Sequence, residues 1–204
     1  MPGGQTVTGD KEITSGGQRK EWIYEHTGDD LARFVLGVVG ADPLICFGIN
    51  SSTASPNNLD PTLKRVEKYA KQNGFNGWIM LNLYSQRATD PDEMHSEIDN
   101  ELHRQNLKHI SKILGQRNLK LWAAWGTNII KRDYLLGCLR DITNIAYLNE
   151  CQWVMLGSSI NGHPYHPLCR VKGFKLYSTP LVAFDMAGYI ASLTKCATTG
   201  RSTR

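Results

Sequence analysis

The sequence predicts an α/β fold: a three-layer sandwich with a mostly parallel central sheet of about four core strands, plus an N-terminal β-hairpin. Two observations carry this prediction. Continuous apolar runs of strand length suit strands that are buried on both faces, and amphipathic helical segments alternate with them along the chain. The four runs are residues 43–50 (PLICFGIN), 77–84 (GWIMLNLY), 119–126 (LKLWAAWG) and 151–157 (CQWVMLG).

The hairpin is predicted at residues 21–40. Apolar and polar side chains alternate there on both sides of the turn sequence HTGDD, which is typical of two antiparallel strands. Residues 1–20 have no apolar core and are rich in Gly, Ser and Thr, so we expect a flexible leader. We expect one α/β domain over residues 21–197 and a flexible tail over 198–204.

The first helix is predicted at residues 60–74. Asp60 suits the N-cap, Pro61 the first helical position and Gly74 the end. A long helix is expected over residues 89–118, capped by Thr89 or Asp90.

Asn106 falls on the apolar stripe of that long helix, so it must find a polar partner if buried. Further helices are expected over residues 128–142 and 185–195, the last capped by Asp185. Residues 179–184 (TPLVAF) predict a short strand.

Composition excludes several classes of protein. The net charge of +4 tolerates a phosphate-bearing ligand without requiring nucleic acid. The five cysteines are scattered without a C-x-x-C pair, which favours reduced thiols in a cytoplasmic protein. No apolar run approaches the ~20 residues of a membrane span, so we expect no membrane partner. The motifs of P-loop NTPases, α/β-hydrolases and dinucleotide-binding proteins are absent.

Polar residues gather where the four core strands end. Ligands of parallel sheets bind beyond the carboxyl ends of the strands, so we predict a cleft at this edge. The candidate ligand-binding residues are Ser52, Thr53, Arg65, Asn82, Arg87, Asn106, Trp125, Gly126 and His163.

Each candidate also has a structural interpretation. Residues 50–53 can form a capped turn, and Arg87 can pair with Asp90 or Asp92 at the surface. Asn106 can brace the loops over the cleft instead of touching a ligand. Trp125 can stack on a nucleobase, although a tryptophan at the end of such a strand is more often part of the core.

The segment Ser158–Leu168 (SSINGHPYHPL) follows the fourth core strand and holds two histidines three residues apart. Its two prolines exclude a regular helix, and with it a helical metal motif. We therefore expect neither a metal nor a cofactor. His166, fixed by Pro167, is predicted to act in the cleft as an acid, a base or a hydrogen-bond donor. The alternative is a histidine that only braces its own loop.

Four motifs resemble those of the domain-of-unknown-function family 1643: INSSTASPNNLDPTLKRV, GFNGWIMLNLYSQRATDP, AAWG and LGSSINGHPYHPL. The resemblance runs from about Trp22 to Leu168 and implies an α/β domain, in a family found in bacteria, archaea and phages, without a settled activity. Three positions depart from the family pattern. This chain has Ser51 in place of Pro, Leu107 in place of Asp and Ile160 in place of Lys.

A weaker, architectural resemblance links the chain to the uracil-DNA glycosylase superfamily. There, an Asn or Asp after the first strand positions water and a late His-Pro loop faces the scissile bond. This resemblance implies catalytic roles for Asn50 and His166. It is an analogy at the level of the fold.

Two functional hypotheses follow. The first is an enzyme that hydrolyses an N-glycosidic bond of a nucleobase, nucleotide or nucleic acid, with Asn50 and His166 as catalytic residues. The second is a protein that binds a nucleotide or small anion without catalysis. The expected partner is a nucleotide or nucleobase-containing ligand, with nucleic acid as the other class of partner; the sequence leaves the oligomeric state open.

Overall fold

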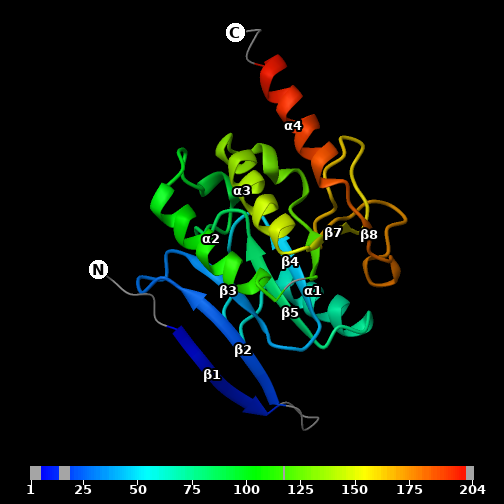
Figure 1. The fold of residues 1–204 in the computed structure, drawn as a ribbon. Helices are drawn as coiled ribbons and strands as arrows, with labels where there is room; N and C mark the ends of the chain where they lie inside the picture. The colour runs from blue at the N-terminus through cyan, green and yellow to red at the C-terminus, as the bar shows by residue number, and fades with distance from the viewer. Residues whose placement is uncertain (1–5, 14–18, 117, 201–204) are drawn as a thin grey trace.

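A computed structural model describes residues 6–13, 19–116 and 118–200 of the 204-residue chain (Figure 1). The strands are β1 (Thr6–Ile13), β2 (Arg19–His26), β3 (Arg33–Val38), β4 (Pro43–Gly48), β5 (Gly77–Asn82), β6 (Lys120–Ala123), β7 (Gln152–Met155) and β8 (Val182–Ala183). The α-helices are α1 (Pro61–Gln72), α2 (Asn100–Leu114), α3 (Tyr134–Leu148) and α4 (Met186–Gly200). Three short 3-10 helices are η1 (Pro91–Glu93), η2 (Gly126–Ile130) and η3 (Leu176–Ser178).

The described strands form one sheet in the order β1-β2-β3-β5-β4-β6-β7-β8. The α/β class is thus confirmed, and the hairpin at residues 21–40 corresponds to the antiparallel pair β2–β3. The expectation of a mostly parallel sheet is wrong, because the sheet is mixed. Strands β5, β4, β6 and β7 pair in parallel, whereas β3 joins β5 antiparallel and β8 joins β7 antiparallel.

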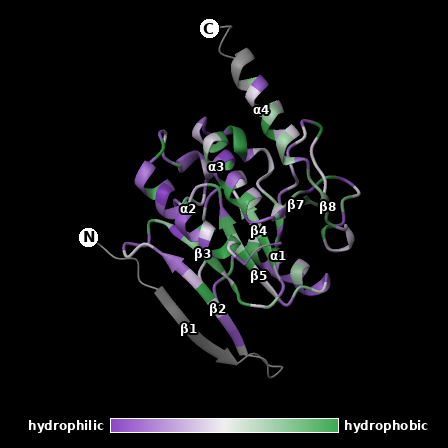
Figure 2. Ribbon diagram, in the orientation of Figure 1, coloured by the Kyte–Doolittle hydropathy of each residue, from purple (hydrophilic) through white to green (hydrophobic). Residues whose placement is uncertain are grey.

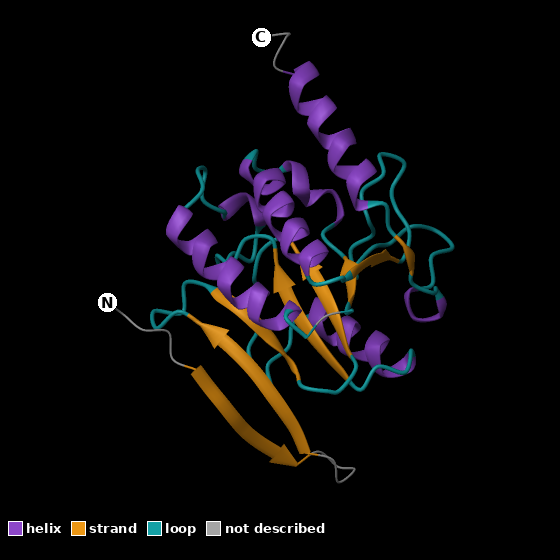
Figure 3. Ribbon diagram, in the orientation of Figure 1, coloured by secondary structure: helices purple, strands orange, loops and turns teal. Residues whose placement is uncertain are grey.

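The central strands are buried on both faces, which explains their continuous apolar sequences. In β4, Leu44 and Cys46 join a core cluster that contains the apolar residues of α1, whereas Ile45 and Phe47 join a second cluster with α2 and α3. Helices therefore cover both faces of the sheet (Figure 3). Hydrophobic residues fill the central strands, and α2 turns a hydrophilic side outward (Figure 2).

Helix α1 begins and ends where the sequence predicts. Asp60 caps it, with Oδ1 accepting a hydrogen bond from the Leu63 N–H at 2.8 Å, and Pro61 occupies the first helical position. Gly74 just beyond the helix has φ +84°, a value that favours glycine. The α1 N-terminus therefore stands at a fixed place beside the end of β4.

The prediction of one long helix over residues 89–118 is wrong for the residues before Asn100. Asp90 caps only the single turn η1, and α2 begins at Asn100 with Asp99 as its N-cap. Met94 between them has an extended backbone and a side chain that is only 2% exposed. Arg132 also donates to the carbonyls of Asp92 and Met94, which holds the segment in a loop.

The third helix also begins later than expected, because residues 126–130 form the 3-10 helix η2 and α3 starts at Tyr134. The predicted strand over residues 179–184 is present as β8, and Asp185 accepts a hydrogen bond from Gly188 N–H at the start of α4. Helix α4 extends away from the body of the protein (Figure 1).

Within the predicted leader, residues 1–20, the described residues 6–13 form β1; residues 1–5 and 14–18 lie outside the described part. Most of the predicted tail, residues 201–204, lies outside it as well. Among the described helices, none combines the length and the apolar character that crossing a membrane would require.

Candidate functional site

A cavity of about 350 Å³ lies beyond the carboxyl ends of the central strands. Its walls come from the segments that follow β4, β5 and β6, from the N-terminus of α1 and from the loop after β7. The polar residues that line it are Arg33, Asn50, Ser52, Thr53, Asp60, Thr62, Thr89, Asn128 and His166. This is the position at which a parallel sheet predicts a binding site.

Five of the sequence-predicted residues line this cavity: Asn50, Ser52, Thr53, Trp125 and His166. The other six surround it or lie deeper. They are Arg65, Asn82, Arg87, Asn106, Gly126 and His163, and each is held by contacts within the protein. The structure thus separates a group of pocket-lining residues from a group of bracing residues.

Arg87 fixes the loop after β4. Its Nη1 donates to the carbonyl oxygens of Ser52 (2.6 Å) and Ala54 (3.2 Å), and its Nη2 donates to Asp30 Oδ1 (2.8 Å) and the Tyr24 hydroxyl (2.5 Å). Its carboxylate partner is therefore Asp30 and not Asp90 or Asp92. The guanidinium is buried and committed to the protein, so its geometry suits positioning of the loop.

Asn50 uses one end of its amide to hold the loop and presents the other at the cavity. Its Nδ2 donates to the carbonyl oxygens of Ala88 (2.6 Å) and Ser51 (3.2 Å). The hydrogen bonds among the described residues include none to its Oδ1, so this acceptor is available to a water or a ligand donor.

Asp60 joins the capped helix to the loop. Its Oδ1 caps α1, and its Oδ2 accepts a hydrogen bond from Ser52 Oγ at 2.6 Å. Both oxygens of this pocket carboxylate thus have protein partners. Ser52 is oriented by the same bond, while Thr53 is exposed beside it.

Arg33 is a pocket residue that sequence reasoning missed. It lies in β3 and is only 2% exposed, and its side chain makes one hydrogen bond, from Nη1 to the Ala54 carbonyl oxygen at 2.9 Å. Its Nε is buried without a partner. Burial, with the nearby Arg87 cation, lowers the pKa of Arg33 to about 10, which leaves it protonated at neutral pH. The available signal was a lone cation in the apolar strand sequence ARFVL.

His166 is a neutral imidazole in this site. Burial lowers its pKa to about 4, against an opposing effect of Asp60 and a reinforcing effect of Arg65. Its Nδ1 accepts the Leu168 N–H at 3.2 Å. The ring proton of the neutral form therefore sits on Nε2, and the ring carries one donor for the cavity.

Two contacts fix the His166 loop from outside. Arg65 of α1 donates to the Pro167 carbonyl oxygen at 2.9 Å. Gly126 has φ +63°, and a Cβ there would lie 3.3 Å from His166 Cβ. A side chain at Gly126 would be strained by its backbone and would press on the histidine. Both residues position His166 without lining the cavity.

Trp125 and His163 meet in a buried network with α4. The Trp125 indole N–H donates to the Tyr189 hydroxyl at 3.2 Å, and that hydroxyl bonds His163 Nδ1 at 2.9 Å. The Trp125 side chain packs against Trp153, and the whole residue has no exposed surface. The network ties the loop after β7 to the last helix.

Asn82 and Asn106 are buried braces beneath the cavity. Asn106 Nδ2 donates to the carbonyl oxygens of Asn82 (3.0 Å) and Leu83 (3.3 Å). In the orientation that satisfies its hydrogen bonds, Asn82 Nδ2 donates to the carbonyl oxygens of Asn50 (3.1 Å) and Leu81 (3.3 Å). The two amides thus connect α2, β5 and the loop that bears Asn50.

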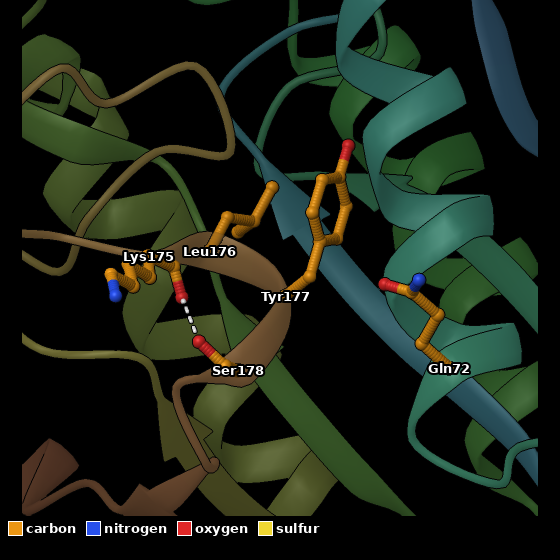
Figure 4. Close-up of a pocket in the computed structure, with 5 residues that line it drawn as sticks. All are labelled: Gln72, Lys175, Leu176, Tyr177 and Ser178. Atoms are coloured by element: carbon orange, nitrogen blue, oxygen red, sulfur yellow. Dashed lines mark hydrogen bonds between the residues drawn. The ribbon is translucent and has the colours of Figure 1, made fainter.

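A second hollow lies away from these residues, between the C-terminal end of α1 and η3. It is lined by Gln72, Lys175, Leu176, Tyr177 and Ser178 (Figure 4). None of the sequence-predicted site residues lies there.

Comparison with known proteins gives one match. The model of the family described as "Protein of unknown function (DUF1643)" matches residues 33–168, about two thirds of the chain. No curated protein and no solved structure matches the chain. The matched range begins at Arg33 and includes every polar residue that lines the cavity.

Proposed function

The chain belongs to the DUF1643 family, and we propose that it binds a small phosphate-bearing ligand of the nucleotide class in the cavity beside Arg33. One observation carries this proposal: a buried guanidinium lines the cavity with a single hydrogen bond and an unpartnered Nε. A buried charge is costly unless it is paired. An anion in the cavity would add to the attraction from the Asp60 carboxylate, which acts on the charge of Arg33 in the same cavity. The planar fork of arginine suits phosphate oxygens.

The rest of the cavity supports the binding of an anion. His166 offers an N–H donor that stays neutral down to pH of about 4, and Thr53 and Thr89 add hydroxyl groups. The one carboxylate in the lining, Asp60, already accepts two hydrogen bonds. These features favour binding over acid–base catalysis, because the one lining carboxylate already holds the α1 N-terminus and Ser52.

The nucleotide class is suggested by the size of the cavity and by its amides. About 350 Å³ lies within the range of small-ligand pockets, roughly 300–1,000 Å³. Asn50 Oδ1 and the Asn128 side chain can hydrogen-bond the edge of a base. We expect the phosphate to lie near Arg33 and the base to lie toward these amides.

A second candidate function is hydrolysis of an N-glycosidic bond in the same cavity. The observation in its favour is that Asn50 and His166 line one cavity, with an acceptor on the first and an N–H donor on the second. Asn50 Oδ1 would orient the attacking water, and His166 Nε2–H would stabilise the charge on the departing base. With its depressed pKa, His166 would act as a hydrogen-bond donor and not as a proton donor.

Ligand-dependent thermal unfolding tests the binding proposal. At constant ionic strength, the four ribonucleoside monophosphates and their parent nucleosides are added separately to the protein. We expect at least one nucleotide to raise the unfolding midpoint clearly more than its nucleoside, because only the nucleotide pairs with Arg33. A ligand at 100 times its Kd stabilises by about 2.7 kcal/mol. Equal shifts with nucleotide and nucleoside would overturn the proposal.

The same samples separate binding from catalysis. Free base detected by chromatography would identify the N-glycosidic activity. In that case Asn50→Ala should abolish the release of base. A nucleotide that stabilises the protein and is recovered intact would favour the binding function alone.

A further inference from the structure

Six exposed cations lie on α1 and on the loop between β7 and β8, outside the cavity. Helix α1 carries three exposed lysines, and the loop between β7 and β8 carries three exposed cations: Lys64, Lys68 and Lys71, with Arg170, Lys172 and Lys175. We call these six residues, with Gln72 and Tyr177 between them, the α1 basic surface. The net charge of the whole chain is only +4, so the remainder of the chain is net negative.

Acidic groups do not neutralise this surface. Residues 151–184 contain no Asp or Glu at all. The one acidic residue of α1, Glu67, pairs with Lys20 at 2.7 Å. Among the ion pairs of the described residues, none involves the six cations. Six uncompensated charges remain for a partner that carries repeated negative charge.

The two halves of the surface are joined in the fold. Tyr69 of α1 donates to the Thr179 carbonyl oxygen at 2.9 Å, and Arg65 donates to the Pro167 carbonyl oxygen within the loop at 2.9 Å. Lys68 Nζ lies 4.4 Å from the centre of the Tyr177 ring. Lys64, Lys68 and Lys71 follow one face of the helix, about one 5.4 Å turn apart. The lysine face of α1 and the loop segment around Lys175 and Tyr177 therefore lie side by side.

An aromatic ring stands within this charged surface. Tyr177 is half-buried and borders a hollow of about 510 Å³ with Lys175 and Gln72 (Figure 4). In the figure the Gln72 amide and the Lys175 amine lie on opposite sides of this ring. Aromatic rings flanked by cations are the means by which proteins hold unpaired bases while binding their phosphates.

We propose that the α1 basic surface binds single-stranded nucleic acid, with the lysines on successive phosphates and a base on or beside Tyr177. A duplex offers the same phosphates but keeps its bases stacked, so it would lose the contact with Tyr177. This proposal does not depend on the ligand of the Arg33 cavity. The two sites nevertheless share α1, whose N-terminus lines the cavity and whose exposed face carries three of the six cations.

Fluorescence anisotropy with a labelled 12-nucleotide single strand tests the proposal on the full chain. We expect saturable binding at 50 mM salt that weakens with salt. The log–log slope should be about −4 if six phosphates are contacted, from about 0.7 per phosphate. The matching duplex should bind at least fivefold more weakly. Binding to vesicles with one third anionic lipid is measured in parallel, to separate recognition of nucleic acid from binding to any surface of repeated negative charge.

Two matched triple variants locate the surface. Lys64→Gln/Lys68→Gln/Lys71→Gln removes three cations from α1 and should weaken binding at least tenfold, with the slope reduced to about −2. Arg104→Gln/Lys108→Gln/Lys112→Gln removes three exposed cations at similar spacing from α2, which packs on the opposite face of the sheet. This control should change the affinity less than twofold.

A third variant tests the aromatic contact. Tyr177→Ala should weaken the binding of the single strand at least fivefold. Its affinity for the duplex should stay within twofold of that of the unaltered protein. Equal losses in the two triple variants, duplex binding as tight as single-strand binding, or binding of the vesicles without binding of the oligonucleotide would each overturn the proposal. So would the absence of saturable binding at 50 mM salt.

Discussion

At the scale of single residues, the site separates into groups that can contact a ligand and groups that hold them. Arg87 has the residue type expected of a phosphate ligand, yet four hydrogen bonds commit it to the protein. Arg33 is hidden in a strand sequence, yet it lines the cavity, and its side chain makes a single hydrogen bond. Residue type was visible in the sequence, but the pairing that decides the role arises from contacts between residues distant in the chain.

His166 provides a test at the same scale. Its folded pKa of about 4 lies below the ordinary value of 6.5, so the unfolded chain binds the proton first as the pH falls. The contribution of His166 to the free energy of unfolding is therefore fully present above pH 6.5 and is lost progressively as the pH falls to about 4. We predict that His166→Gln loses less stability between pH 7.0 and 4.5 than the unaltered protein does, measured by urea unfolding.

Other groups contribute to that pH dependence in both proteins. Burial also lowers the pKa values of His109 and His163, so the variant is expected to retain part of the loss. An identical loss of stability in the two proteins would contradict the assignment of His166 as a neutral imidazole whose pKa is lowered in the folded protein.

At the scale of elements, the sequence predicted those whose signals are local. The cap at Asp60, the proline after it and the apolar stripe place α1 within a residue or two of its observed bounds. The predicted start of the long helix at Thr89 or Asp90 was wrong because Asp90 and Pro91 begin only one 3-10 turn, and α2 begins after Asp99. The buried Met94 and the bonds from Arg132 to this segment decide for a loop, and neither contact is visible in local sequence.

Helix α4 shows how an element outside the cavity supports it. Its Tyr189 hydroxyl accepts from Trp125, which follows β6, and bonds His163 in the loop that carries His166. We predict that Tyr189→Phe destabilises the protein by about 1–3 kcal/mol, because two buried polar groups lose a partner. Chemical denaturation measures this change in the free energy of unfolding.

A matched substitution controls for the loss of a hydroxyl group as such. Tyr147 at the end of α3 is 81% exposed, and Tyr147→Phe should stay within about 0.5 kcal/mol of the unaltered protein. A Tyr189→Phe variant as stable as Tyr147→Phe would show that the network does not anchor the loop.

At the scale of the whole molecule, the alternation of strands and helices predicted the α/β class, and the rule for parallel strands predicted where the cavity lies. The antiparallel pairing of β3 with β5 and of β8 with β7 was not predicted. The hairpin β2–β3 was expected from its alternating pattern, but its attachment through β3 to β5 depends on pairing between segments about 40 residues apart. That attachment is what brings Arg33 to the cavity, so the error in topology and the missed residue have one cause.

The central claim is that Arg33 holds an anion in this cavity, and calorimetric titration of Arg33→Met tests it most directly. The titrants are inorganic phosphate and the nucleoside monophosphate that most stabilises the unaltered protein. Arg104→Met, an exposed arginine of α2, is the matched control. Arg33→Lys, which keeps the charge, serves as a second variant if Arg33→Met does not fold.

We predict at least tenfold weaker binding to Arg33→Met, weaker binding to Arg33→Lys because the planar fork is lost, and unchanged binding to Arg104→Met. Folded Arg33 variants that bind the nucleotide as tightly as the unaltered protein would contradict the account.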